Sequence, residues 1–145
     1  MNLGEILPDP WVMDNSRTFP PTFPAGCPPA DAGPAGGTVF RIVADDPPVN
    51  DDFLSAAELG RQPPPKLTRA QACRRHALSV YRSIDDARHH VSVFPGTGRF
   101  IAAGVLVPDC GMTKDTPNPT HPSHVDWWCY DGIDRYRGFA VIEGQ

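Results

Sequence analysis

The pattern of apolar and polar positions divides this chain into short segments. Four of them are β-branched or continuously apolar and predict strands, over residues 38–43, 78–81, 99–107 and 138–142. Residues 78–81 alternate, so a strand there places Ser79 and Tyr81 on one face and two aliphatic side chains on the other. The run 99–107 is the longest, which makes it the best candidate for a central strand.

Three further segments carry helix signals. Residues 51–59 begin with two aspartates and are followed by a glycine, as is typical of a short helix. Thr68 and Gln71 have the spacing of a capping box, which predicts a second helix that runs to about residue 76. A third helix is predicted after Ser83, with an inner side formed by Ile84, Ala87 and Val91 and an outer side that shows Arg88 and His89.

Together these segments predict an α+β fold: a single compact domain of about four to six strands with short helices, over residues 38–145. Residues 1–37 hold eight of the eighteen prolines and predict a proline-rich extended arm, because proline neither sustains a helix nor pairs within a central strand. The arm also carries apolar bulk, so part of it is expected to lie against the domain or a neighbouring subunit. Residues 109–123 are polar and proline-rich and predict a long loop.

Composition narrows the expected partners and location. The formal net charge is -4 at pH 7, so no basic field favours nonspecific binding of nucleic acid or of an anionic membrane. No apolar run approaches the roughly 20 residues that span a bilayer. The first thirteen residues have neither the basic nor the apolar region of a signal peptide. We therefore expect a cytoplasmic protein without a membrane partner.

Cysteine spacing argues against cross-links. The four cysteines are Cys27, Cys73, Cys110 and Cys129, and no two form a Cys-x-x-Cys pair. This spacing predicts free, buried thiols rather than a disulfide framework or a zinc ribbon. Cys27 lies in the arm, so only the other three are expected to meet in a core.

The densest chemistry lies in residues 120–130, with two histidines, a carboxylate, two tryptophans, a thiol and a phenol. His121 and His124 have the spacing of half a zinc site, but a proline separates them and a close cysteine pair is missing, so no metal is expected. Trp127 and Trp128 point to opposite faces of a strand. The pair either belongs to the core or an interface, or leaves one ring to stack a nucleobase or nicotinamide.

Polar residues far apart in the sequence are candidates for one site. Arg41 stands in the first apolar strand, where its guanidinium must reach solvent or find a carboxylate or phosphate. It is either an edge-facing arginine or an anion-binding residue at the floor of a cleft. In that cleft Ser79 would supply a hydroxyl, and His124 or Asp126 a third polar group. Ser79 or Ser123 with His124 and Asp126 could also form a hydrolase triad, although no Gly-x-Ser-x-Gly motif is present.

The order of residues 40–42, 78–81 and 124–128 resembles the three-part layout of the ADP-ribosyltransferase-like superfamily, including its bacterial toxin branches. There a basic residue on an early strand, a serine-bearing strand and a later acidic or polar residue surround NAD. The resemblance covers about residues 38–142, and the chain is also similar to small bacterial proteins of unassigned function. The usual Glu-x-Glu or Gln-x-Glu is absent, and Ser123, His124 and Asp126 stand in that neighbourhood.

The resemblance implies NAD as the cofactor and a role for each matching residue. Arg41 would hold the phosphates or ribose of NAD, Ser79 would order the cleft, and His124 or Asp126 would act at the ribosyl carbon. Tyr81 and Trp128 are the implied neighbours of the bound cofactor.

Two functions from different classes follow. The first is a nucleotide- or NAD-binding or NAD-processing domain; whether it is an enzyme stays open. The alternative is a noncatalytic binding or assembly protein that docks on a partner chain through residues 1–37. A role as an immunity or inhibitor protein is compatible with the same residues.

Overall fold

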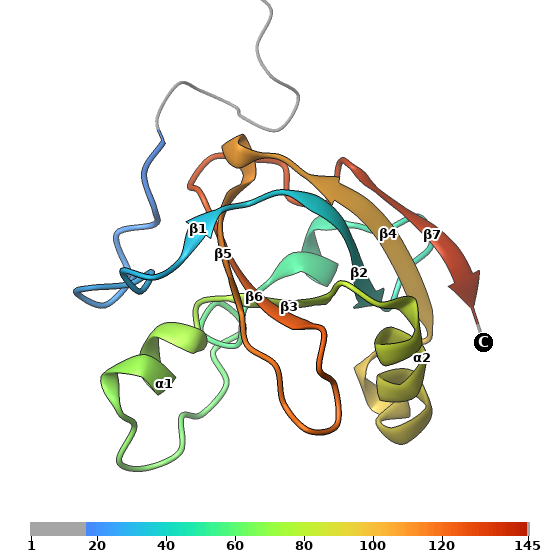
Figure 1. The fold of residues 1–145 in the computed structure, drawn as a ribbon, viewed down its shortest axis with the longest axis horizontal. Coiled ribbons are helices and arrows are strands. Elements are labelled where there is room, and N and C mark those ends of the chain that lie inside the picture. The colour runs from blue at the N-terminus through green and yellow to red at the C-terminus, as the bar shows by residue number, and fades with distance from the viewer. Residues whose placement is uncertain (1–16, 145) are drawn as a thin grey trace, which may run out of the picture.

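The strands form one antiparallel sheet. The computed structural model describes residues 17–144 and leaves residues 1–16 and 145 outside the description. In this part seven strands follow the order β1-β5-β6-β3-β2-β4-β7 (Figure 1). Their bounds are β1 Gly33–Pro34, β2 Gly37–Val43, β3 Leu78–Tyr81, β4 Phe100–Leu106, β5 Gly111–Asp115, β6 His124–Cys129 and β7 Phe139–Gly144. The prediction of a single α+β domain is confirmed, with more strands than the four to six expected.

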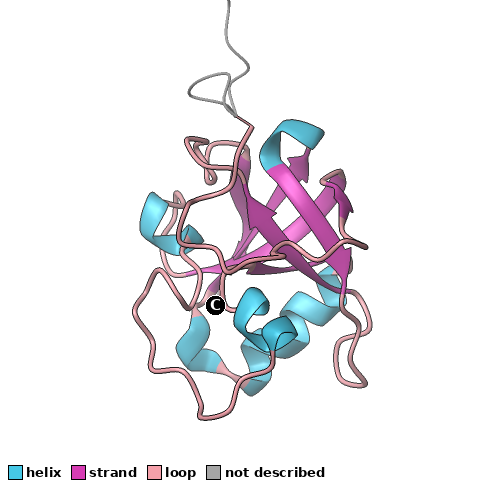
Figure 2. Cartoon of the chain, turned by 90° about the vertical axis from the view of Figure 1, so that its left-hand side faces the viewer, coloured by secondary structure: helices cyan, strands magenta, loops and turns pink. Residues whose placement is uncertain are grey.

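Helices are short and occupy the margins of the curved sheet (Figure 2). The two α-helices are α1 Arg69–Arg74 and α2 Ile84–Val93, and the 3-10 turns are η2 Asn50–Phe53, η3 Pro95–Thr97 and η4 Pro108–Cys110. The predicted capping box is present, because the Thr68 hydroxyl accepts from the Gln71 amide at 3.1 Å and the Gln71 side chain accepts from the Thr68 amide at 2.8 Å. The predicted helix over 51–59 is reduced to η2, because Leu54 is extended. No helix in residues 17–144 has the length and apolar character needed to cross a bilayer.

The first face of the sheet carries the main core. Its buried side chains come from alternate positions of the strands, and they include Val39, Val43, Leu78, Val80, Val125 and Trp127. Phe53 and Phe139 close this core with ring centroids 4.9 Å apart, and Phe139 stacks on Trp127 at 6.1 Å. The alternation expected for residues 78–81 is therefore confirmed. Ser79 and Tyr81 emerge on the opposite face.

The second face is covered in two separate places. Helix α2 packs Ala87 and Val91 onto Tyr81 and Ile101. At the other end, residues of the arm pack with Cys73 and Ala77 over Trp128. Between the two covers Ser79 is exposed, whereas His124 and Asp126 are buried.

The described part of the arm is held on the same chain. Cys27 and Cys73 form a disulfide, so the prediction of four free thiols is wrong, although Cys110 and Cys129 are buried and form no disulfide. The Phe19 ring lies 4.8 Å from the Tyr130 ring, and β1 pairs with β5. Part of the arm therefore lies against the domain, as the apolar residues within it predict.

Strand β5 lies inside the segment predicted to be a long loop. It pairs with β6 over five positions, from Gly111 opposite Cys129 to Asp115 opposite Val125. Of the predicted loop 109–123, residues 109–110 belong to η4 and residues 116–123 remain without a strand. The composition of β5 is polar, so this strand is specified by pairing with β6 rather than by its own pattern.

Candidate functional site

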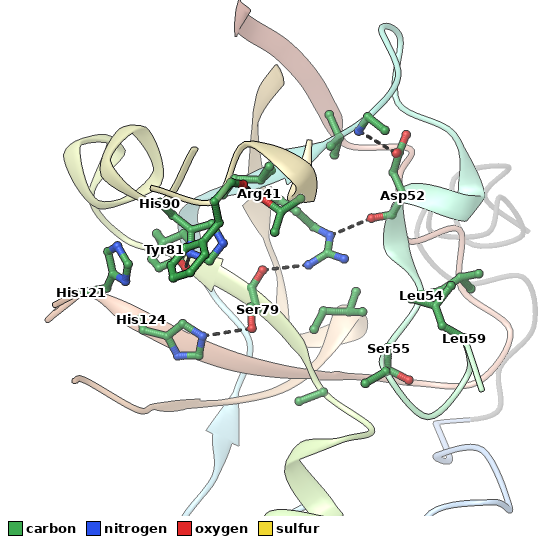
Figure 3. Close-up of a pocket in the computed structure, with 18 of the residues that line it drawn as sticks. Arg41, Asp52, Leu54, Ser55, Leu59, Ser79, Tyr81, His90, His121 and His124 are labelled. Carbon is green, nitrogen blue, oxygen red and sulfur yellow. Dashed lines mark hydrogen bonds between the residues drawn. The ribbon is translucent and has the colours of Figure 1, made fainter. Parts of the chain in front are cut away.

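A cleft of about 980 Å³ opens where strands β2 and β3 separate. Arg41 from β2, Ser79 and Tyr81 from β3 and His124 from β6 all line it (Figure 3). The residues around η2, the end of α2 and the loop 116–123 form its walls. Four of the six predicted site residues are thus brought together, although the sequence separates Arg41 from His124 by more than half the chain.

Arg41 is fixed at the point where β2 and β3 part. The two strands share a single paired position, Phe40 with Tyr81. Arg41 Nη1 donates to the Ser79 carbonyl at 2.8 Å, and Nε donates to the Asp52 carbonyl at 2.9 Å. Its guanidinium also lies 5.3 Å from the centre of the Phe53 ring. Arg41 therefore donates to two backbone carbonyls, a partner that the sequence-based alternatives of solvent, carboxylate or phosphate did not include.

Burial lowers the pKa of Arg41 to about 10, so the guanidinium still carries its charge at neutral pH. Its Nη2 atom forms no hydrogen bond with residues 17–144. A bound anion could therefore use Nη2 without breaking the two backbone contacts.

Ser79 and His124 form a direct side-chain pair. The Ser79 hydroxyl oxygen lies 3.0 Å from His124 Nε2, and the other ring nitrogen, Nδ1, lies 2.8 Å from the Thr116 hydroxyl oxygen. The Thr116 amide donates to the His124 carbonyl at 2.9 Å, so the backbone of the same residue is also fixed. The His124 side chain is buried while Ser79 is exposed to the cleft.

Four of the five histidines gather around Tyr81. The Tyr81 hydroxyl lies 3.0 Å from His90 Nδ1, and its ring meets His121 and His124 edge-on, each at 5.4 Å. His89 Nδ1 lies 3.1 Å from His121 Nε2. Helix α2 and the loop 116–123 are thus joined to β3 through imidazole rings.

Burial is the main cause of the altered pKa values in this cluster. It lowers the pKa of His90 and of His124 from the ordinary value of 6.5, and the neighbouring His121 lowers both further. Arg74 also lowers the pKa of His124, while Asp126 opposes it. Burial raises the pKa of Tyr81 to about 12, so the phenol stays protonated. Both imidazoles are therefore neutral at neutral pH.

This cluster makes stability depend on pH. In the unfolded chain these histidines take up protons near 6.5, whereas in the folded chain they do so only at lower pH. The free energy of unfolding should therefore be highest when the pH is above the pKa of the histidines in the unfolded chain, and it should decrease as the pH drops below that pKa. Urea unfolding at about pH 7.5 and about pH 5.5 measures this difference.

The matched variants are His90→Gln, which removes one titrating group, and Asp86→Asn as the control. Burial raises the pKa of the Asp86 carboxyl, but hydrogen bonds from Ser123 outweigh burial and lower it below its usual 3.8. Asp86 therefore titrates outside this pH window. His90→Gln should flatten the pH dependence and Asp86→Asn should not. An unchanged dependence in His90→Gln would contradict the assignment.

Asp126 and Trp128 are not among the residues that line the cleft, although the sequence predicts both in the site. Asp126 is 3% exposed, and its carboxylate accepts from Arg74 Nε at 2.7 Å. Trp128 is 1% exposed, and its Nε1 donates to the Cys73 carbonyl at 3.1 Å beneath the arm. No face of this ring is open to stack a ligand. Both tryptophans are buried, because Trp127 lies in the main core on one face of β6 and Trp128 lies beneath the arm on the other.

Several residues of the cleft carry no usable signal in the sequence. Arg61 and Arg74 line it, and Thr116 orients His124 from the segment predicted to be a plain loop. His90 is the exception, because it lies beside the inner positions Ala87 and Val91 of the predicted helix. The periodicity of α2 could therefore have found it.

The charge of the cleft suits an anion. Arg41, Arg61 and Arg74 line it together with Asp51 and Asp52. Both carboxylate oxygens of Asp52 accept hydrogen bonds from backbone amides, those of Ala44 and Val49. The Asp52 carboxylate therefore stabilises its own loop. Among residues 17–144, no group of three or more histidine, cysteine or acidic side chains is arranged to hold a metal ion.

Fold and site together define a small antiparallel α+β domain with a polar cleft where β2 and β3 separate. Comparison of the chain with protein-family models, curated proteins and solved structures finds no match. The resemblance to ADP-ribosyltransferase-like proteins therefore stays a prediction.

Proposed function

We propose that the cleft binds a nucleotide, with NAD as the first ligand to test. The observation that carries this proposal is the meeting of Arg41, Ser79, Tyr81 and His124 in one cleft. Its volume of about 980 Å³ lies at the upper end of the range usual for small-molecule sites. The arginines supply charge for phosphates.

Phe94 offers a surface for the base. It lines the cleft and is 50% exposed, whereas the other aromatic side chains of residues 17–144 are buried or partly buried. A flat exposed ring of this kind stacks a nucleobase or nicotinamide with little loss of side-chain entropy. Phe94 thus takes the role that the sequence suggested for Trp128.

Binding is better supported than transfer of ADP-ribose. Asp126, one of the two residues expected at the ribosyl carbon, is buried in its pair with Arg74. The other, His124, faces the cleft but is tied to Ser79 and Thr116. We therefore propose ligand binding as the primary function and leave the transferase chemistry as a hypothesis.

The test is a thermal-shift titration with NAD, ADP-ribose and ATP. A ligand at 100 times its Kd adds about 2.7 kcal/mol to the free energy of unfolding, or roughly 5 to 10 °C in Tm for a domain of this size. Arg61→Ala should reduce the shift, because Arg61 is exposed and lines the cleft. Arg69→Ala is the matched control on the exposed surface of α1, outside the cleft-lining set.

No shift with any of the three nucleotides would overturn the proposal. Equal shifts in Arg61→Ala and Arg69→Ala would also contradict it, because binding would then be elsewhere. Arg41→Ala is less informative alone, since it leaves the carbonyls of Asp52 and Ser79 without their donor.

The alternative, assembly through residues 1–37, now concerns a shorter segment. Residues 17–37 are held on their own domain by the Cys27–Cys73 disulfide and by the packing of Phe19 and Phe23 against the cluster around Trp128. Residues 1–16 lie outside the described residues, and docking of a partner on them stays a proposal. Deleting them and repeating a pull-down tests it.

The disulfide also bears on location. Structural disulfides persist mainly in oxidising compartments, whereas the sequence predicts a cytoplasmic protein. We propose that the chain matures where Cys27 and Cys73 can oxidise. Alkylation of thiols in intact cells, followed by mass spectrometry, would support a cytoplasmic location instead if both cysteines are modified.

A further inference from the structure

The exposed hydroxyl of Ser79 lies in the middle of the sheet. Strand β3 is fourth of seven in the sheet order, and Ser79 is its one exposed residue. Neighbouring β2 leaves the strand after one paired position, which opens the cleft beside Ser79. The backbone at this position is fixed on both sides, by pairing with Asp126 of β6 and by the Arg41 guanidinium on the Ser79 carbonyl. A reactive group here would be held rigidly and would still meet solvent.

His124 is placed to take the proton of this hydroxyl. Its Nε2 lies 3.0 Å from the Ser79 oxygen, which is within the range of a nucleophile and its general base. Thr116 contacts Nδ1 at 2.8 Å, and a hydrogen bond with the Thr116 backbone favours a proton on the ring. With the Nδ1 proton directed at Thr116, Nε2 presents its lone pair to Ser79. The lowered pKa keeps that lone pair free at neutral pH.

Arg74 brings a positive charge to the strand position next to Ser79. Asp126 is the cross-strand partner of Ser79, so their side chains leave the sheet on one face as neighbours. Asp126 holds Arg74 through Nε, and the Arg74 side chain is 52% exposed and lines the cleft. The terminal nitrogens of Arg74 can therefore meet negative charge that develops near Ser79.

Other nucleophiles of the described chain are less suited. The thiols of Cys110 and Cys129 are buried in the main core, and burial raises the pKa of Cys129 to about 12. The Ser123 hydroxyl donates to the Asp86 carboxylate, so it is engaged outside a histidine pair.

We propose that Ser79 is a nucleophile, with His124 as its general base and Thr116 as the residue that positions His124, and that the pair hydrolyses small carboxylic esters bearing an anionic group. Ser79 Oγ attacks the ester carbonyl carbon while its proton passes to His124 Nε2. The proton then leaves with the alcohol as the carbon–oxygen bond breaks, which gives an acyl-serine. Water attacks the acyl carbon, His124 takes the proton of that water and returns it to Ser79, and the carboxylic acid leaves. This inference does not rest on nucleotide binding.

The test uses diisopropyl fluorophosphate on the full chain, with peptide mass spectrometry to locate the modified residue. Ser79 forms a bond to phosphorus and fluoride leaves, with the serine proton taken up by His124. We expect labelling at Ser79, none at that position in Ser79→Ala, and a rate at least about 100-fold lower in His124→Gln. Ser92→Ala is the matched control, because Ser92 is exposed on α2 and its hydroxyl donates to the His89 carbonyl.

Thr116→Val separates positioning from folding. The variant removes the Nδ1 contact and keeps the shape of the side chain, so it should slow labelling and change its pH profile while Tm changes little. If His124→Gln fails to fold, this variant carries the test of the histidine. Labelling that is absent in the folded native chain, that lands on another residue, or that is equally fast in Thr116→Val would overturn the proposal.

The ester substrate is tested with p-nitrophenyl benzoate and with the mono-p-nitrophenyl ester of terephthalate, whose para carboxylate cannot reach its own ester carbonyl. Faster hydrolysis of the anionic ester, lost in Ser79→Ala and reduced to the rate of the neutral ester in Arg74→Gln, is the expected result. Equal rates for the two esters, or rates unchanged in Ser79→Ala, would refute the substrate class.

Discussion

Reduction of the Cys27–Cys73 disulfide should lower the free energy of unfolding by about 4 kcal/mol, because the bond closes a loop over a sequence separation of 46. The cross-link restricts the unfolded chain more than the folded one. In the folded state it also holds the arm over Trp128, which is 1% exposed beneath it. Urea unfolding with and without dithiothreitol measures the loss.

The double variant Cys27→Ser with Cys73→Ser is the control for the reductant. It should be as unstable as the reduced native chain and should not respond to dithiothreitol. A thiol count in denaturant should find two thiols in the oxidised chain, Cys110 and Cys129. Four reactive thiols, or a native chain whose stability ignores the reductant, would show that this bond is absent in solution.

Among glycine-to-alanine substitutions, Gly111→Ala should be the most destabilising. It should lower the free energy of unfolding by about 3 kcal/mol. Gly111 starts β5 with a φ of +132°, which disfavours any side chain. A Cβ there would lie 2.0 Å from the Trp128 carbonyl oxygen, and this atom belongs to backbone that cannot rotate away. Strand β5 would have to move relative to β6.

The same shift should reach the candidate site. Thr116 follows β5 directly and holds His124 through both its amide and its hydroxyl. A folded Gly111→Ala variant should therefore also react more slowly at Ser79. Gly36→Ala is the control, because a Cβ at Gly36 would have no atom within 4 Å and the φ of this glycine is not in the left-handed region. Equal stability of the two variants would contradict the close approach of β5 and β6.

Local patterns predicted the central strands and the helix starts. Residues 38–43, 78–81 and 99–107 are apolar enough to require burial, and all three are strands. The alternation of β3 correctly separated Ser79 and Tyr81 from the core. Thr68 and Gln71 meet in the capping box that their spacing indicates. These features depend on neighbours within a few positions of the chain, which is why the sequence suffices for them.

Strands β1 and β5, at one end of the sheet, were beyond local reasoning. Strand β1 consists of a glycine and a proline, and β5 contains Gly111, Lys114 and Asp115, which are residue types depleted in strands. Each pairs with a neighbour that is already in place: β5 on β6, and β1 on β5. Their stability comes from that neighbour and from the disulfide that secures the arm.

The candidate site, like the fold, was predictable from the sequence only in part. The sequence by itself determined that Arg41 is a charge within an apolar strand and that Ser79 and Tyr81 occupy strand positions outside the main core. Only the tertiary structure decided that Arg41, Ser79, Tyr81 and His124 share a cleft, that Asp126 is buried with Arg74, and that the arm covers Trp128. The reason is that alternation sets the face of a side chain locally, whereas strand order and the cover on each face arise from contacts between distant segments.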